Sequence, residues 1–263
     1  MNNKICNLCK QNVADKFNSH IIPKFMCKGL FEDTKPRHSI AINSKGKSRN
    51  IQDTPKENNI LCSNCEKRIE IIETYFARKI VDIHNYKNLK NNFEIKKILN
   101  QEYLCCETIN PKAFKLFIYT IIWRTSISSL NEFMKFKIKE NIEDEIRIFI
   151  NSNLKNTHKE LLENFEKIQL TPKYDFCIFK PIVNSNQSRG IFTSYNTSEN
   201  SHILLIVDFA IYIFTSEKNI DNSFKYFSNS QNEKVLIALA EVEKWNELNR
   251  IIVYQMLENK NGC

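Results

Sequence analysis

Glycine and proline are scarce in this chain, whose 263 residues include 4 glycines and 6 prolines. The glycines, at positions 29, 46, 190 and 262, stand too far apart for a nucleotide-binding loop, because such loops need closely spaced glycines before a helix. The low glycine and proline content also excludes a collagen-like or linker-rich protein, and the balance of 42% hydrophobic with 26% charged residues excludes a disordered one. We therefore expect a folded chain with one large domain or two small ones.

Long apolar segments are also missing. The N-terminus reads MNNKICNLCKQN, which is polar throughout and lacks the apolar core of a signal peptide. The most apolar segment, 114–130, is interrupted by Lys115 and Arg124 and is too short and too polar for a membrane span. We expect a cytoplasmic protein without membrane contact. Nine cysteines, an odd number, are then not expected to form a disulfide framework.

The net charge of +8 is concentrated near the N-terminus. Residues 1–60 carry 11 Lys and Arg against 5 Asp and Glu, whereas residues 61–263 carry 27 against 25. The segment 34–52 contains no acid and five cations, which are Lys35, Arg37, Lys45, Lys47 and Arg49. Such a cluster attracts polyanions, and phosphate contacts of this kind dominate nucleic-acid affinity. Candidate phosphate contacts are Lys24, Lys45, Lys47 and Arg49; the alternative is a solvated basic loop.

Hydrophobic periodicity divides the chain into three parts. The polar N-terminal part predicts a loop-rich hairpin, with extended segments at 20–25 and 39–43. Predicted helices follow at 63–85, 111–130, 141–154 and 157–168, then strands at 174–183, 190–194, 202–208 and 210–215, and a final helix at 232–257. Pro111 suits a first helical position. Trp123 and Arg124 lie on an apolar helical segment and are expected in the core rather than on a partner surface. The predicted divisions are 1–85, 86–170 (helical) and 171–263 (α/β, of unassigned role).

Two CxxC pairs carry the strongest chemical signal. Cys6 and Cys9 form one pair, and Cys62 and Cys65 form the other. Four thiolates presented in pairs with this spacing suit a tetrahedral zinc site, and a closed site of four thiolates is structural. The alternative is coincidence among nine cysteines. The remaining cysteines are expected to be buried or incidental thiols: Cys27, Cys105, Cys106, Cys177 and Cys263.

Between the two pairs the chain reads Asn-Ser-His-Ile-Ile-Pro-Lys over 18–24, and the second pair lies within Leu-Cys-Ser-Asn-Cys-Glu over 61–66. These residues resemble the HNH, or ββα-metal, nuclease superfamily, whose members often carry an Asp-His-Ile-Ile-Pro strand between two CxxC knuckles. The resemblance covers 1–85, about a third of the chain. It implies an α+β fold in which a small zinc-bound, treble-clef-like ββα-metal head precedes a helical and α/β body.

The resemblance also implies roles for individual residues. In that family the strand histidine takes a proton from water, so His20 would be the general base, a role that an imidazole titrating near neutral pH can perform. Ser19 stands where the family usually has an Asp ligand, and Glu66 where it usually has Asn or His. We therefore expect that the carboxylate has moved to the helix, with Glu66 holding Mg²⁺ or Mn²⁺. Glu70 and Glu73 share the helical face of Glu66 and are either a second carboxylate or an exposed acidic stripe.

Other polar residues are weaker candidates. The middle asparagine of the HNH pattern has three candidates, which are Asn43, Asn58 and Asn59. His38 is interpreted as a surface histidine rather than a ligand or phosphate contact. The remaining histidines have no companions in the sequence and are interpreted as structural: His84, His158 and His202.

The resemblance thus implies a metal-dependent endonuclease that hydrolyses phosphodiester bonds, with DNA as the expected substrate. We expect structural Zn²⁺ and catalytic Mg²⁺ or Mn²⁺, and the resemblance further implies a role in bacterial defence or restriction. Residues 86–263 would bind a protein partner or form an oligomer. The alternative is a zinc-stabilised nucleic-acid-binding or protein-interaction module that has lost catalysis, which the substitution at Ser19 favours.

Overall fold

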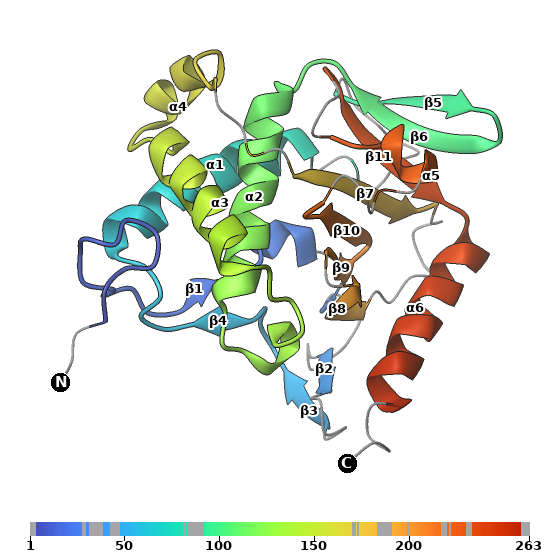
Figure 1. Ribbon diagram of the computed structural model, residues 1–263, viewed down its shortest axis with the longest axis horizontal. Coiled ribbons are helices and arrows are strands. Elements are labelled where there is room, and N and C mark those ends of the chain that lie inside the picture. Colours follow the sequence, from blue (N-terminus) through green and yellow to red (C-terminus); the bar gives the residue numbers. More distant parts are fainter. Residues whose placement is uncertain are drawn as a thin grey trace.

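A mixed seven-stranded sheet lies at the centre of the computed structural model, with helices on both of its faces (Figure 1). The structure describes residues 4–27, 30–31, 39–42, 48–80, 83, 92–169, 172, 174–182, 191–198, 200–216, 220, 222–229 and 233–258. The strands are β5 (Glu94–Ile98), β6 (Gln101–Cys106), β7 (Asp175–Pro181), β8 (Ile191–Ser198), β9 (Ser201–Val207), β10 (Phe209–Phe214) and β11 (Val235–Ala240). Their order is β5-β6-β11-β7-β10-β9-β8, and β11 pairs with β7 in parallel whereas the other neighbours are antiparallel.

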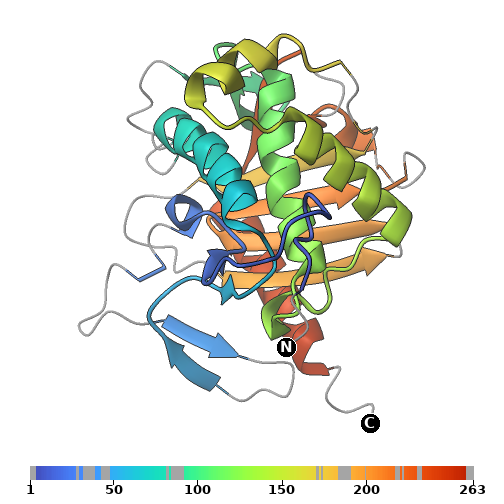
Figure 2. The same cartoon turned by 90° about the vertical axis from the view of Figure 1, so that its left-hand side faces the viewer.

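Four helices cover one face of this sheet (Figure 2). They are α1 (Ser63–Ile80), α2 (Pro111–Ile127), α3 (Glu140–Asn153) and α4 (His158–Phe165). Helix α2 is buried on all sides from residue 113 to residue 126, as expected for a helix inside a layer rather than on its surface. Asn110 caps it by accepting hydrogen bonds from the backbone N–H groups of Lys112 and Ala113, and Pro111 occupies the first turn as predicted.

The opposite face of the sheet packs against the C-terminal helices, which are α5 (Asn222–Lys225) and α6 (Val242–Glu258). Trp245 of α6 contacts Ile203 and Leu205 of β9 there, while their neighbour Leu204 faces the helical layer. This alternation is the period-two pattern of a strand buried on both faces. No helix among the described residues is long and apolar enough to cross a membrane.

The N-terminal part lies against the helical layer. Strand β1 (Ser19–His20) pairs with β4 (Lys56–Glu57), and a 3-10 helix, η1 (Lys24–Cys27), follows β1. A separate hairpin of β2 (Ser39–Ile42) and β3 (Ser48–Ile51) projects away from the sheet (Figure 2).

One hydrophobic core connects these parts. A single cluster of buried side chains runs from Cys6 to Leu239 and includes residues on both sides of the predicted boundaries at 85 and 170. The rings of Phe76 in α1 and Phe117 in α2 stack with centroids 4.6 Å apart. The N-terminal part and the helices therefore share their apolar contacts.

The predicted α+β class is confirmed, as are the starts of the helices in the middle of the chain and the strands after residue 174. Two expectations about secondary structure were wrong, and one hairpin was missed. The run Val-Leu-Ile-Ala-Leu-Ala at 235–240 is a buried strand, since continuous apolar runs do not distinguish a strand from a helix. The hairpin β5–β6 was not predicted. Residues 24–27 form a 3-10 helix instead of an extended segment.

Candidate functional site

The four predicted zinc-binding cysteines lie together. The Sγ atoms of Cys6, Cys9, Cys62 and Cys65 are all within 4.8 Å of one another, and those of Cys9 and Cys62 are 4.0 Å apart. Sulfurs about 2.3 Å from a tetrahedral Zn²⁺ would be separated by about 3.8 Å, so this cluster fits such an ion. The thiols share protons at this range: a hydrogen bond from Cys65 lowers the pKa of Cys6 to about 4. The four cysteines could therefore hold a metal ion such as zinc.

Local backbone geometry presents the two pairs. Lys10 has a φ of 55°, which turns the chain back after Cys9, and its N–H donates to the Cys6 carbonyl at 2.9 Å. The second pair lies at the N-terminus of α1, where the Asp15 carboxylate accepts hydrogen bonds from the Ser63 N–H at 2.7 Å and hydroxyl at 3.1 Å. These hydrogen bonds lower the pKa of Asp15. The first turn of α1 thus faces the loop that carries the first pair.

His20 lies between two charges of opposite sign. Its Nε2 is 3.9 Å from the nearer carboxylate oxygen of Asp53, whose other oxygen is 2.6 Å from the Lys56 ammonium. Lys56 is also the residue paired with His20 across β1 and β4. Burial and the Lys56 charge lower the pKa of His20, while Asp53 acts in the opposite direction. The imidazole is therefore neutral at pH 7 and able to accept a proton.

Asp53 was missed from the sequence, where it only marks the end of the basic segment. It lies near His20 because β4, three residues further on, pairs with β1. No sequence signal identifies it, since 33 residues separate it from His20. The Lys56 ammonium lowers the pKa of Asp53 and keeps it ionised.

Arg124 is buried in α2, which confirms its expected place in the core together with Trp123. Its Nε donates to the Thr120 carbonyl at 3.1 Å, and one terminal nitrogen donates to the His20 carbonyl at 2.7 Å. The other terminal nitrogen forms an ion pair with Glu73 of α1. Glu73 is therefore neither a free second carboxylate nor part of an exposed stripe. Burial raises the pKa of Glu73, and Arg124 opposes that shift.

Three residues of the resemblance share one property. Ser19 Oγ, His20 Nε2 and Glu66 Oε2 are buried atoms that have no hydrogen-bond partner among the described residues. Buried polar atoms in folded proteins nearly always have a partner, which is often a water or an ion. Glu70, one turn after Glu66, is exposed. Among the carboxylates on this face of α1, Glu66 is therefore the one with a buried oxygen that could hold a cation.

The candidate phosphate contacts are only partly described. Lys24 is exposed on η1, and Arg49 of β3 is 72% exposed while forming an ion pair with Glu132 at 3.3 Å. Asn58 accepts a hydrogen bond from the Asn18 N–H at 2.8 Å, and Asn59 has a φ of 58°, so both serve the turn before the second cysteine pair. Several named residues lie outside the described residues: Lys35, Arg37, His38, Asn43, Lys45, Lys47, His84 and Cys263.

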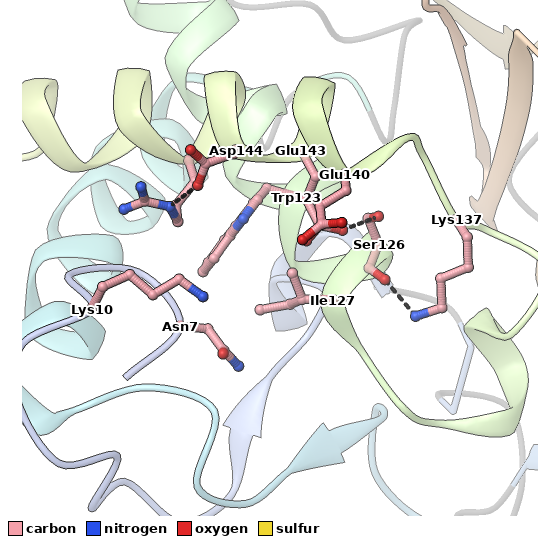
Figure 3. Close-up of a pocket in the computed structure, with 10 residues that line it drawn as sticks. Asn7, Lys10, Trp123, Ser126, Ile127, Lys137, Glu140, Glu143 and Asp144 are labelled. Carbon is pink, nitrogen blue, oxygen red and sulfur yellow. Dashed lines mark hydrogen bonds and ion pairs between the residues drawn. The ribbon is translucent and has the colours of Figure 1, made fainter. Parts of the chain in front are cut away.

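A cavity of about 420 Å³ lies between the first cysteine loop and helices α2 and α3 (Figure 3). Neither His20 nor Glu66 lines it. Among its lining residues, the Ser126 hydroxyl donates to Glu143 at 2.6 Å, and Arg147 is 2.6 Å from Asp144. Because neither predicted residue lines it, this cavity is separate from the predicted site.

Comparison with known proteins identified no relative: no family model matches the chain, and no significant match was found among curated proteins or solved structures.

Proposed function

We propose that this protein is a metal-dependent endonuclease that hydrolyses phosphodiester bonds in DNA. The observation that carries the proposal is the position of His20. It lies in a short antiparallel strand pair whose second strand, β4, comes shortly before α1; Cys62 directly precedes this helix, and Cys65 and Glu66 lie in its first turn. A cysteine loop, a strand pair and a helix that starts at the second cysteine pair follow one another along the chain, and this order supports the proposed treble-clef arrangement. The same order occurs in the HNH enzymes that the sequence resembles.

Zinc at the four cysteines has a structural role in this proposal. Cys6, Cys62 and Cys65 are almost completely buried, and four thiolates fill a tetrahedral coordination shell. No coordination position then remains for water or substrate. The ion would instead join the first loop to the start of α1, which positions Glu66.

His20 acts as the general base. Its lowered pKa keeps the ring neutral at physiological pH, so the imidazole removes a proton from the attacking water. Asp53 lies close enough to stabilise the imidazolium that forms, and Lys56 holds Asp53 in place. The product of this step is a hydroxide directed at the scissile phosphorus.

Glu66 would hold the catalytic Mg²⁺ or Mn²⁺. Its buried carboxylate oxygen without a partner is a hard donor, as these ions require. When bound, the ion supplies positive charge that stabilises the phosphate and the leaving oxygen. Lys24 and Arg49, with Lys45 and Lys47, are proposed to contact the DNA backbone. A role in bacterial defence or restriction, with 86–263 as the partner-binding part, rests on the resemblance.

The test is cleavage of plasmid DNA with Mg²⁺ or Mn²⁺ by wild type, His20→Ala, Glu66→Ala and Glu70→Ala. We expect His20→Ala and Glu66→Ala to lose cleavage but to keep the zinc content and the DNA affinity of the wild type. Glu70→Ala is the matched control, because Glu70 is exposed one turn further along the same helix, and it should cut normally. Cleavage by Glu66→Ala would contradict the proposed ligand.

A module without catalysis is the second candidate, and Ser19 favours it. The side chain is completely buried and cannot replace the anionic ligand that the family carries at this position. If wild type binds DNA but cleaves none under either metal, this second function takes the place of the first.

A further inference from the structure

Three arginines donate to backbone carbonyls of other segments, and two of them connect the N-terminal part to the helical layer. Arg68 joins two helices of that layer: it lies in α1 and donates to the carbonyls of Asn151, in the last turn of α3, and of Leu154, just after α3. Arg147 of α3 donates to the Leu8 carbonyl at 2.9 Å, in the first cysteine loop. Arg124 of α2 donates to the carbonyl of His20 itself. Arg124 therefore differs from the other two in contacting the proposed base.

The strand that carries His20 is short, and a hydrogen bond holds it on either side: the Asn18 N–H donates to Asn58 at 2.8 Å, and the Ile21 N–H donates to the Pro55 carbonyl at 3.2 Å. Strand β1 has two residues, and its ladder consists of Ser19 opposite Glu57 and His20 opposite Lys56. Asn18, just before it, has a φ of 56°, so the chain turns sharply as it enters the strand. The contact from the buried guanidinium adds a restraint at the His20 carbonyl itself.

The guanidinium is itself held firmly. Arg124 is 1% exposed, and its three nitrogens contact three different segments: α2 at Thr120, α1 at Glu73 and β1 at His20. A planar fork with donors at fixed angles places its acceptors relative to one another, which a lysine ammonium cannot do. Glu73 supplies the charge that makes a buried arginine tolerable.

We infer that Arg124, held by Glu73, is a positioning residue for His20, so that the helical layer sets the orientation of the imidazole. This inference rests on the proposed function for its catalytic consequence. Arg124 touches no reacting atom. It fixes the peptide of the base, and a displacement of the order of 1 Å at a reacting group lowers turnover by about 100-fold.

The experiment compares Arg124→Lys and Glu73→Gln with a matched control, Arg147→Lys. A lysine at 124 keeps the positive charge beside Glu73 but loses the fork that reaches His20. Arg147 makes the same kind of contact, to a carbonyl of the cysteine loop instead. The first readout is the imidazole signals of protein labelled at its 5 histidines, with the His20 signal assigned through His20→Gln. The second is the zinc content, and the third is the split between kcat and KM for DNA cleavage.

Arg124→Lys should move or broaden the His20 signal, leave that of His202 in place and retain zinc, with kcat about 100-fold lower at an unchanged KM. Arg147→Lys should leave the His20 signal and kcat as in wild type. If Arg124→Lys loses zinc, the His20 signal of Glu73→Gln is the deciding measurement. Glutamine keeps the shape of the Glu73 side chain and removes only the charge that holds the guanidinium of Arg124. An unmoved His20 signal in the folded variants would overturn the inference.

The imidazole readout does not depend on cleavage. A wild type that cuts no DNA refutes the proposed function. A His20 signal that is unchanged by the substitutions at Arg124 and Glu73 refutes the positioning role alone.

Discussion

Among the charged groups that act on the His20 ring, Lys56 and Asp53 have the largest effects, ahead of Arg124 and Lys24, and the two act in opposite directions. Burial and Lys56 favour the neutral ring, and Asp53 favours the imidazolium. A general base needs both: a neutral ground state that accepts the proton and a charged state that is not prohibitively costly. Lys56 and Asp53 therefore oppose each other in setting the protonation of the proposed base.

Changing either neighbour should shift the pKa of His20 in a known direction. Asp53→Asn removes the negative charge and should lower it, whereas Lys56→Met removes the positive charge and should raise it. The measurement is an NMR titration of the His20 ring without divalent ions. The acid limb of the pH–rate profile should move with it, to lower pH for Asp53→Asn and to higher pH for Lys56→Met. Shifts of the same sign in both variants would exclude this electrostatic account.

His202 of β9 should make the protein less stable in acid. It is 2% exposed, its Nδ1 lies 2.7 Å from Asn196 Oδ1, and burial lowers its pKa from 6.5 to about 4. Below pH 6.5 the unfolded chain binds a proton that the folded chain rejects, so the free energy of unfolding falls by about 3 kcal/mol by pH 4. Denaturant unfolding at pH 7 and at pH 4 should show a smaller loss for His202→Gln than for wild type. His158→Gln, at an exposed site, should behave as wild type does.

At the scale of elements, α2 organises the site. It contacts α1 through Phe117 and Phe76, holds β1 through Arg124, and presents Trp123 to the cavity beside α3 (Figure 3). Its C-terminal end is also tied to β4, since Glu57 accepts hydrogen bonds from the hydroxyls of Ser128 and Ser129. Both strands of the β1–β4 pair therefore depend on this helix.

The start of α2 should contribute measurably to stability through its cap. Asn110 accepts hydrogen bonds from two backbone N–H groups of the first turn, at 2.9 and 3.1 Å. Asn110→Ala should lower the free energy of unfolding by about 1 kcal/mol, because those donors lose their partner. Asn110→Ser keeps an accepting oxygen and is the control, which should stay closer to wild type; both variants lose the amide hydrogen bond to Glu166 at 2.9 Å, so their difference reports the cap oxygen alone. Equal losses in the two variants would show that the cap oxygen is unimportant.

At the scale of the whole molecule, the apolar core does not stop at the cysteine cluster. Ile21, Ile22 and Leu61 near the cluster belong to the same group of buried residues as Phe176 and Ile206 of the sheet. Removing the metal site should therefore affect the stability of the entire described chain.

Cys62→Ser should lower the thermal midpoint of the chain in one transition rather than melt the N-terminal part alone. Metal binding and folding are coupled in such clusters, and the core transmits the loss. Far-UV circular dichroism reports the whole chain, and fluorescence reports Trp123 and Trp245, both outside the N-terminal part. The two midpoints should fall together. Cys27→Ser, a buried cysteine outside the cluster, should keep one zinc ion per chain; separate transitions in Cys62→Ser would contradict the shared core.

Local patterns in the sequence were sufficient for the cysteine pairs, the helices that begin near residues 63, 111, 140 and 158, and the place of Pro111 in a first turn. Each of these features depends on residues within a few positions of one another, and at that range the spacing determines which face of a helix or strand a side chain occupies. The cap at Asn110 was not predicted. The run at 235–240 shows the limit, because a uniformly apolar segment has no period to read.

The contacts around His20 could be found only in the folded chain. Asp53 reaches the imidazole through strand pairing, and Arg124 reaches the His20 carbonyl across 104 positions of sequence. Glu66 and Glu73 lie on the same face of α1 by their spacing in the sequence. In the folded chain, however, Glu73 is paired with the buried Arg124, whereas Glu66 has a buried oxygen without a partner among the described residues. Periodicity shows that a face is buried or exposed, but the partner on that face depends on how distant elements pack, because the free energy of burying a charge is set by its neighbours in space.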